Sequence, residues 1–327
     1  MSVPWLEKYR PKNLDDIVGN NETINRLKII GKYGNMPNII LCGPPGIGKT
    51  TSIYCLANKL FNNNKELIKK GVLELNASDE RGINVIRDKI KTFASTQQIF
   101  LKGFKLIILD EADSMTSSAQ FALRRIIEKY TKNTRFCLIC NYVSKIISPV
   151  ASRCAKFRFQ LLNNKSMLNK LKYITKQEKL IINDKTLNKI IDISCGDMRK
   201  CITLLQSASL MKPIGNEITL NDVNSVIVTI DKTFVSDKII PIMKKNVFEN
   251  VKNLCDYIIN EGLPVTLLLE RIIEYIIDAN ELSDIQKSDI AINIAQTDLK
   301  LCEGANEYLQ LLAVLGNIHT IYKKIFQ

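Results

Sequence analysis

A glycine-rich loop is the segment of this chain whose residue types and spacing point most clearly to chemistry. It reads Gly43-Pro44-Pro45-Gly46-Ile47-Gly48-Lys49-Thr50 and lies between a short apolar run and a helical pattern. Glycines let the backbone wrap around an anion, so that successive N–H groups and the helix N-terminus point at phosphates. Lys49 would then reach the β- and γ-phosphates, while the Thr50 hydroxyl would complete a Mg²⁺ shell. The loop predicts a nucleoside triphosphate site, with an ordinary glycine-rich turn as the alternative.

Acidic residues follow a second apolar run, and an amide follows a third. The run 106–109 is followed by Asp110 and Glu111, and the run 135–140 is followed by Asn141. Asp110 can hold Mg²⁺, directly or through water, and Glu111 can orient and deprotonate the attacking water. Asn141 could hydrogen-bond the γ-phosphate or that water, although an asparagine after a strand is often only a turn former. In one α/β unit with the phosphate loop, these residues predict the catalytic side of the site.

Two arginines could add positive charge to a triphosphate. Arg153 lies in Ser152-Arg153-Cys154, and Arg199 lies in Gly196-Asp197-Met198-Arg199. An arginine beside the γ-phosphate can stabilise the charge of the transition state as a finger. Arg199 opens a predicted helix outside the α/β pattern and could contact phosphate from there. A surface salt bridge is the alternative for each arginine taken alone.

Five apolar runs must position these residues, and each lies between stretches of helical periodicity. The runs are 38–42, 72–75, 105–109, 135–140 and 156–159. This alternation predicts an α/β layer sandwich with a buried parallel sheet. Ligands of such sheets bind at the carboxyl ends of the strands, where the glycine-rich loop falls.

The strand pattern stops after Phe159, and the remainder of the chain has helical patterns. We predict a nucleotide-binding α/β domain at 1–161, a small helical domain at 162–230 and a C-terminal helical domain at 231–327. A helicase of the DEAD-box class shares the tetrapeptide Asp110-Glu111-Ala112-Asp113 but would need a second α/β domain. The helical pattern after Phe159 disfavours that alternative.

Charge and cysteine spacing bound the classes of function. The formal net charge of +13 suggests an anionic partner such as nucleic acid, although scattered lysines also form ordinary solvated faces. No apolar run approaches the ~18–20 residues that cross a bilayer, and no signal-peptide pattern is seen, so we expect an intracellular protein.

Cys137 and Cys140 have a metal-like spacing, but no second such pair exists and His319 is the sole histidine. We therefore predict structural thiols in a reducing compartment.

Six segments occur together and in a fixed order: 5–11, 43–50, 75–82, 110–113, 152–154 and 196–199. This set resembles the small subunits of replication factor C, the clamp loader of the AAA+ ATPases, densely over 1–210 and thinly after that. Stretches between 93 and 159 are most similar to the subunit called 3 in fungi and 5 in animals. The resemblance implies an AAA+ RecA-like parallel five-stranded sheet, a helical lid with a second sensor, and an all-α collar for oligomerisation.

Such subunits form a heteropentameric ring that uses ATP to open a sliding clamp and load it onto primer–template DNA in replication and repair. The resemblance therefore implies ATP and Mg²⁺ as cofactors, and the other ring subunits, the clamp and DNA phosphates as partners. It also implies a nuclear location and no membrane. Two alternatives stay open: a subunit shared with a checkpoint or cohesion loader, and an adaptor that binds ATP without hydrolysing it. Glu111 and Arg153 argue against the adaptor.

The resemblance also assigns roles within the ATP site. Asn141 would be the first sensor and Arg199 the second, while Arg153 would act in trans on the neighbour's ATP. Val3 and Tyr9 would offer flat apolar surface to adenine, with a tail packed on the core as the alternative. The residues expected around the nucleotide are Val3, Tyr9, Arg10, Pro11, Val18, Gly43, Pro44, Pro45, Gly46, Ile47, Gly48, Lys49, Thr50, Thr51, Asn141 and Arg199.

Three further sites are implied outside the loop. Asn76, at the end of the second strand, would face Glu111 and hold it idle until DNA binds. Arg81, Arg87 and Lys91, on and before one amphipathic helix, would grip template phosphates, with a solvated basic face as the alternative. Gln120 and Arg124 are weaker candidates for the same role. Ile99, Phe100 and Leu101 resemble a degenerate clamp-binding box, although plain packing of a helix end would also explain them.

Overall fold

The computed structural model describes residues 3–77, 83–96, 103–211, 216–226, 232–245 and 247–326. The chain divides into two compact units, Met1–Val226 and Ile227–Gln327, which are described separately. Four residues of the sequence predictions lie outside the described residues: Arg81, Ile99, Phe100 and Leu101. The side chain of Arg87 lies outside them too.

A five-stranded parallel sheet forms the centre of the first unit, in the order β2-β3-β4-β1-β5. The strands are β1 (Ile39–Cys42), β2 (Val72–Asn76), β3 (Lys105–Asp110), β4 (Thr134–Cys140) and β5 (Ala155–Arg158). The predicted runs agree with these bounds to within one residue at each end. The strands could be recognised in the sequence because a parallel strand covered on both faces is nearly all apolar. Every residue from Leu106 to Leu109 of β3 is fully buried.

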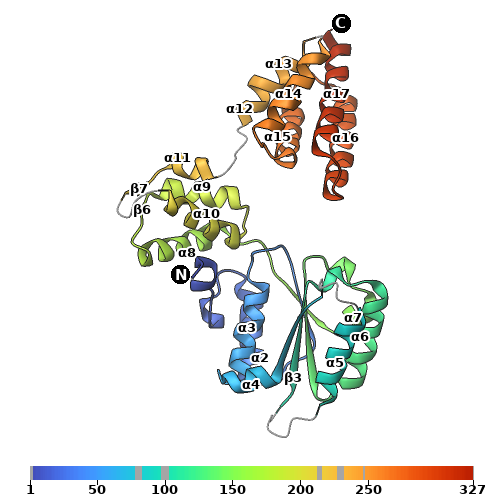
Figure 1. Ribbon diagram of the computed structural model, residues 1–327. Helices are drawn as coiled ribbons and strands as arrows, with labels where there is room; N and C mark the ends of the chain where they lie inside the picture. The colour runs from blue at the N-terminus through green and yellow to red at the C-terminus, as the bar shows by residue number, and fades with distance from the viewer. Residues whose placement is uncertain are drawn as a thin grey trace. The chain divides into compact units, whose positions relative to one another are not determined.

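Helices cover both faces of this sheet (Figure 1). One face carries α2 (Asn21–Tyr33), α3 (Lys49–Leu60) and α4 (Lys65–Gly71). The other face carries α5 (Ile83–Ser95), α6 (Ser117–Tyr130) and α7 (Ser148–Ala151). The arrangement is the α/β layer sandwich that the five apolar runs predicted.

The register of the sheet brings the polar strand ends to one edge. Cys42 of β1 pairs with Cys140 of β4, and Leu109 of β3 pairs with Leu138 of β4. The glycine-rich loop after β1, Asp110 at the end of β3 and Asn141 after β4 therefore meet at the carboxyl edge. Asn76 at the end of β2 pairs with Asp110.

In the described residues of the first unit, the sheet is followed by the helices α8 (Asn164–Gln177), α9 (Asp184–Ser194), α10 (Met198–Leu210) and α11 (Leu220–Val226). The structure adds a two-stranded parallel sheet, β6 (Ile181–Ile182) with β7 (Glu217–Ile218), which the sequence did not predict. Strands of two residues are too short to show a periodicity. The N-terminal helix α1 (Trp5–Lys8) contacts α10, where the backbone N–H of Trp5 donates to Gln206 Oε1 at 3.1 Å.

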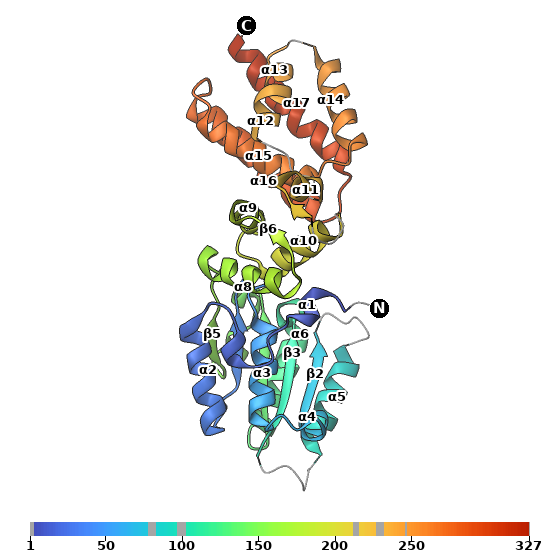
Figure 2. The ribbon, with the colours of Figure 1, turned by 90° about the vertical axis from the view of Figure 1, so that its left-hand side faces the viewer.

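The second unit is entirely helical in its described residues (Figure 2). Its elements are α12 (Lys232–Phe234), a π-helical turn (Val235–Ile239), α13 (Ile240–Met243), α14 (Phe248–Asn260), α15 (Val265–Asp278), α16 (Asp284–Cys302) and α17 (Glu307–Phe326). One apolar core joins them, with Leu268, Ile272, Leu315 and Tyr322 almost fully buried. No described helix combines the length and apolar character needed to cross a membrane. The domain boundaries predicted after residues 161 and 230 stay predictions.

Candidate functional site

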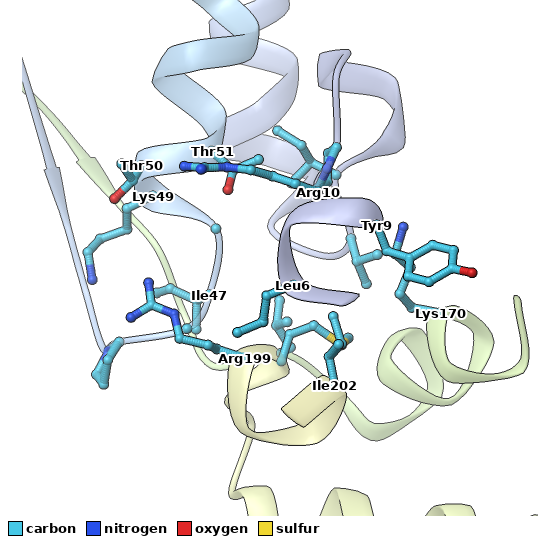
Figure 3. A pocket seen from close by; sticks show the side chains of 18 of the residues that line it. Leu6, Tyr9, Arg10, Ile47, Lys49, Thr50, Thr51, Lys170, Arg199 and Ile202 are labelled. Carbon is cyan, nitrogen blue, oxygen red and sulfur yellow. The ribbon is translucent and has the colours of Figure 1, made fainter. Parts of the chain in front are cut away.

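A cavity of about 380 Å³ lies at the carboxyl edge of the large sheet. Three parts of the first unit line it: the N-terminal segment, the phosphate loop with the adjoining strand ends, and the helices after the sheet (Figure 3). Most residues predicted to surround a nucleotide are among its lining: Tyr9, Arg10, Pro11, Val18, Pro45, Gly46, Ile47, Gly48, Lys49, Thr50, Thr51, Asn141 and Arg199. Asp110 and Glu111 line it as well. The structure therefore gathers the predicted catalytic and binding side chains around one hollow.

The phosphate loop holds Lys49 in a defined position. Lys49 begins α3, it is only 7% exposed, and burial lowers its pKa. Its Nζ donates to the carbonyl oxygens of Gly43 and Pro44, both at 2.6 Å, and to Asn141 Oδ1 at 2.8 Å. Gly43 and Pro44 thus reach the site through their carbonyl groups rather than by lining the cavity. A phosphate oxygen is an acceptor of the same kind, so it could take over contacts that these carbonyls now make.

Thr50 and Asp110 form a pair of oxygen ligands suited to Mg²⁺. Thr50 Oγ1 donates to Asp110 Oδ2 at 3.0 Å, and Asp110 Oδ1 accepts from the backbone N–H of Glu111 at 2.9 Å. Among the described residues, no group of three or more His, Cys, Asp or Glu side chains could hold a metal. The pair fits Mg²⁺ nevertheless, because this ion commonly takes one or two protein oxygens and completes its shell with water and substrate phosphates.

Glu111 has an unusual backbone. Its φ is +53°, in the left-handed region, and it caps the 3₁₀ turn η2 (Ala112–Ser114). Such conformations are uncommon for residues other than glycine and concentrate at functional sites. Its carbonyl oxygen accepts the backbone N–H of Ser114 at 2.9 Å and the Ser114 hydroxyl at 2.7 Å, which fixes the turn. The exposed side chain is thereby presented at the cavity.

Asn76 lies on the strand next to the one that ends before Glu111. Because Asn76 pairs with Asp110, it is one strand spacing and one residue away from Glu111 along the edge of the sheet. The backbone N–H of Ala77 donates to the carbonyl oxygen of Asp110 at 2.8 Å and extends this pairing. A hydrogen bond between the side chains of Asn76 and Glu111 stays a prediction.

Asp113 is a residue of the site whose role the sequence did not reveal. One oxygen, Oδ2, accepts the backbone N–H groups of Asn141 at 3.0 Å and Tyr142 at 3.1 Å. This carboxylate fixes the end of β4 and so directs the Asn141 amide toward Lys49. In the sequence, Asp113 is marked only as the last residue of the tetrapeptide Asp-Glu-Ala-Asp. That tetrapeptide does not predict hydrogen bonds to backbone N–H groups at the end of another strand.

The helix α10 reaches the phosphate loop from the other side. Asp197 caps α10 by accepting the N–H groups of Arg199 at 2.7 Å and Lys200 at 3.2 Å, while the N–H of Met198 donates to the Gly46 carbonyl at 3.2 Å. Gly46 has φ +69°, and a Cβ there would lie 1.6 Å from Asp197 Oδ1. The loop therefore requires glycine at this position both for its turn and for the approach of α10. Arg199 lies on the same side of the cavity as Lys49 (Figure 3).

The opposite end of the cavity is largely apolar and suits a base. Leu6 and Ile202 lie there, while Ile47 lies beside Arg199 (Figure 3). The apolar residues that the sequence analysis did not assign are Leu6, Ile17, Leu162, Met198 and Ile202. They come from four separate segments, and although Leu6 and Met198 lie in segments named above, no residue pattern marks any of the five as part of the cavity. Arg10 extends toward Thr51, and its guanidinium lies 4.9 Å from the centre of the Tyr54 ring.

Two residues predicted to face adenine are placed differently. Val3 is 57% exposed and is not among the residues that line the cavity. The Tyr9 ring points away from the loop (Figure 3) and meets the rings of Trp5 and Tyr173 edge-on. Its hydroxyl donates to Glu178, which also pairs with Lys8 at 2.6 Å. The apolar tail therefore packs toward α8 and α10, which is the alternative noted from the sequence, instead of presenting flat rings to the base.

Arg153 lies outside the cavity of its own chain. Its Nη2 is 2.6 Å from Glu128 Oε1 on α6, and its Nη1 donates to the Pro149 carbonyl at 2.6 Å. Arg124 Nε donates to the same Glu128 oxygen at 3.0 Å. About a third of the Arg153 side chain is exposed, and it is not among the cavity-lining residues.

The candidate nucleic-acid contacts separate into two kinds. Lys91 on α5 is exposed and borders a groove with Arg125 and Lys129 of α6. Gln120 is 3% exposed, its amide donates to the carbonyls of Met115 and Lys145, and its Oε1 accepts the N–H of Ile147. The suggestion that Gln120 contacts DNA is therefore wrong, since its polar atoms are engaged inside the domain.

The paired cysteines of β4 are part of the core. Cys137 and Cys140 are both buried, and burial raises the pKa of Cys140 to about 12. Burial raises the pKa of the Cys137 thiol as well. Thiols held protonated in an apolar strand are poor metal ligands.

Three family models match the chain in succession. The model for the ATPase family associated with various cellular activities (AAA) matches residues 39–161. The AAA+ ATPase lid domain model (RCF1/5-like) matches residues 169–210, and the replication factor C C-terminal domain matches residues 235–317.

Similar proteins cover nearly the whole chain. Human replication factor C subunit 4 is 42% identical over 97% of this chain and 88% of its own length. Subunit 3 of Saccharomyces cerevisiae is 39% identical over 98% and 94%, and the small subunit of Staphylothermus marinus is 42% identical over 98% and 96%. Relatives numbered 2, 3, 4 and 5 are similar to nearly the same degree, so the predicted subunit class is not resolved.

Solved structures support the fold independently. A variant of the Thermotoga maritima RuvB protein has a TM-score of 0.56 and 18% identity, covering 73% of this chain and 82% of its own. At this level of identity, the likeness shows the fold alone.

Proposed function

The chain belongs to the replication factor C small subunits of the AAA+ ATPases. On this basis, we propose how the residues around its cavity bind and hydrolyse ATP. It is an ATP-binding ATP hydrolase and an ATPase component of a clamp loader that acts in DNA replication. A DEAD-type helicase is excluded, because the second unit is helical in its described residues and matches the replication factor C C-terminal domain.

The triphosphate lies along the phosphate loop, with its base in the apolar end of the cavity. The N–H groups of the loop and of the first turn of α3 bind the phosphates, and Lys49 exchanges its carbonyl acceptors for phosphate oxygens. Arg199 adds a second positive charge from α10. Thr50 and Asp110 would hold Mg²⁺, which when bound neutralises charge on the β- and γ-phosphates.

Glu111 is the general base. Its carboxylate accepts a proton from water as the water oxygen attacks the γ-phosphorus and the bond to the β-γ bridging oxygen breaks. Asn141 orients that water or a γ-phosphate oxygen, and Asp113 holds Asn141 in place. The observation that carries this proposal is the meeting of Lys49, Asn141 and the Thr50–Asp110 pair at one edge of the sheet, beside Glu111.

Arg153 completes the site of a neighbouring subunit. Its distance from its own cavity supports this role, since an arginine that touched its own nucleotide would line that cavity. Both side chains of the Arg153–Glu128 pair are more than a third exposed, and ion pairs of this kind contribute only about 0–1 kcal/mol. Arg153 can therefore leave Glu128 for a γ-phosphate at little cost.

Membership of the family is the basis on which we propose the complex in which the chain works. The chain works in a hetero-oligomeric ring with other replication factor C subunits, in the nucleus, where the ring opens a sliding clamp and loads it onto primer–template DNA. Arg81, Arg87 and Lys91 contact phosphates of the DNA backbone, and Ile99, Phe100 and Leu101 contact the clamp. Asn76 restrains Glu111 until DNA is bound.

Glu111→Gln tests the catalytic assignment in the assembled complex. The variant subunit should still bind ATP, whereas turnover at its own site should fall about 10²- to 10⁴-fold, because the amide cannot accept the proton. Glu66→Gln in the first turn of α4 is the matched control and should leave turnover unchanged. Normal single-turnover hydrolysis by the Glu111→Gln site would contradict the assignment.

A further inference from the structure

One wall of the cavity is made by a segment that needs support from other elements. Residues 5–11, which we call the N-terminal strap, contribute Leu6, Tyr9, Arg10 and Pro11 to the lining. The strap contains the single helical turn α1, which has no side-chain N-cap and no buried residue. A helix of one turn is not stable in water by itself. Contacts with other elements must therefore fix this wall.

The first half of the strap is bound to the helices that follow the sheet. The backbone N–H of Trp5 donates to Gln206 Oε1 on α10 at 3.1 Å. Lys8 Nζ donates to Glu178 Oε1 at 2.6 Å, and the Tyr9 hydroxyl donates to the same oxygen. Glu178 is the C-cap residue of α8. One carboxylate thus holds two consecutive residues of the strap.

The Glu178 carboxylate is well placed to make these contacts strong. Its side chain is only 17% exposed. Burial acts to raise the pKa of Glu178, but the hydrogen bonds from Lys8 and Tyr9 lower that pKa overall, so the group is ionised at neutral pH. Hydrogen bonds to an ionised acceptor are stronger than those between neutral groups. The end of α8 is therefore firmly joined to the strap.

The second half of the strap is bound to α3, the helix that follows the phosphate loop. The Pro11 carbonyl accepts from Cys55 Sγ at 3.3 Å, and burial raises the pKa of Cys55 to about 11, so the thiol keeps its proton and donates. The Arg10 guanidinium lies over the Tyr54 ring of α3. The strap therefore spans from α8 and α10 to α3, and its position depends on both attachments.

We propose that Glu178 is a positioning residue for ATP, which fixes the strap and thereby the wall at the base end of the cavity. Glu178 is not among the residues that line the cavity, so it acts through the strap. The inference rests on the proposed function, because it needs ATP in this cavity with its base at the apolar end, where Leu6 lies (Figure 3). The phosphates are bound by other elements, the phosphate loop and α3. Glu178 should therefore affect binding of the base and not of the phosphates.

Glu178→Leu tests this role in calorimetric titrations of the full-length chain with ATP and with inorganic tripolyphosphate. The variant should bind ATP about 10-fold more weakly, because the strap loses two hydrogen bonds to one carboxylate. Its affinity for tripolyphosphate, which has no base, should stay within about twofold of the wild-type value. Glu178→Gln should recover most of the ATP affinity, since its amide oxygen still accepts from Tyr9.

Asp184→Leu is the matched control. It removes a comparable ion pair with Lys172 of α8, at 2.7 Å, and should leave both affinities unchanged. Equal losses of ATP and tripolyphosphate affinity in Glu178→Leu would overturn the proposal, and so would a wild-type affinity for ATP. Failure of the wild-type chain to bind ATP would overturn the proposed function together with this inference.

Tyr9→Phe tests whether Glu178 acts through the strap. Loss of one hydrogen bond should weaken ATP binding about 3-fold in the wild-type background. Beside Glu178→Leu, the same substitution should change nothing further, because the acceptor is already gone. Additive losses in the double variant would show that Glu178 and Tyr9 act independently and would contradict the proposal.

Discussion

The Asp113 carboxylate makes two hydrogen bonds on which the position of Asn141 depends. Without it, two backbone N–H groups at the end of β4 lose their acceptor, each bond being worth about 1 kcal/mol. Asn141 would then lose its fixed relation to Lys49 and to the γ-phosphate. In the proposed mechanism, the catalytic geometry thus depends on a side chain that is not among the residues lining the cavity.

Asp113→Ala should lower kcat at this subunit's site roughly 10-fold while leaving KM nearly unchanged, because the loss concerns orientation rather than binding. Asp113→Asn should restore most of the rate, since the amide oxygen can still accept both N–H groups. Steady-state kinetics of the complex would measure both. Asp222→Ala, which removes a similar carboxylate acceptor for the N–H of Thr219, is the control. Equal loss in the Ala and Asn variants would contradict a positioning role.

Burial of Lys49 gives a pH dependence with a definite sign. Since burial lowers its pKa in the folded chain, the unfolded chain binds more protons between that lowered value and the ordinary 10.5. The contribution of Lys49 to the free energy of unfolding therefore rises as the pH rises through this window. Denaturant titrations from pH 8 to 10 should show wild type gaining stability relative to Lys49→Met. A constant difference between the two would contradict the lowered pKa.

The helix α10 and the phosphate loop are in close contact. Gly46 and Asp197 lie on different elements, and the space between them leaves no room for a methyl group. The position of α10 therefore depends on the conformation of the phosphate loop, and a shift of either element should displace the other.

Gly46→Ala should weaken ATP binding at least about 10-fold, because the new methyl group strains the loop and pushes Asp197 away. Gly34→Ala is a close control: Gly34 has φ +67° and nothing within 4 Å of the added Cβ. It should lower the free energy of unfolding by about 1 kcal/mol through backbone strain and leave ATP affinity unchanged. Isothermal titration calorimetry and thermal melts compare the two variants. Equal effects on affinity would exclude a role for the contact with α10.

The sequence predicted the large sheet because its strands are continuous apolar runs, and it predicted Lys49, Thr50 and Asp110 together because one loop and one strand end place them. The residues that form the apolar end of the cavity could not be predicted, because Leu6, Leu162 and Ile202 come together only in the folded domain. Asp113 accepts backbone N–H groups that follow another strand, which no residue pattern marks. The short strands β6 and β7 were missed because two residues are too few to show a periodicity. Tyr9 lines the cavity as predicted, although its ring points away from the phosphate loop (Figure 3).

At the scale of the whole molecule, we propose that each chain is an incomplete enzyme. Its own side chains bind and position ATP, while Arg153 is held against Glu128 outside that cavity. An ATPase that needs an arginine from its neighbour is active only in an assembly, which links hydrolysis to the integrity of the ring.

The most direct test of this account combines Arg153→Ala and Glu111→Gln in this subunit of the assembled complex. If Arg153 acts in trans, Glu111→Gln stops hydrolysis at this subunit's own ATP site and Arg153→Ala stops it at the neighbour's site. The double variant should then lose more steady-state turnover than either single variant. If Arg153 served the ATP of its own chain, both would silence the same site. The double variant would then match Glu111→Gln alone, and that result would contradict the account.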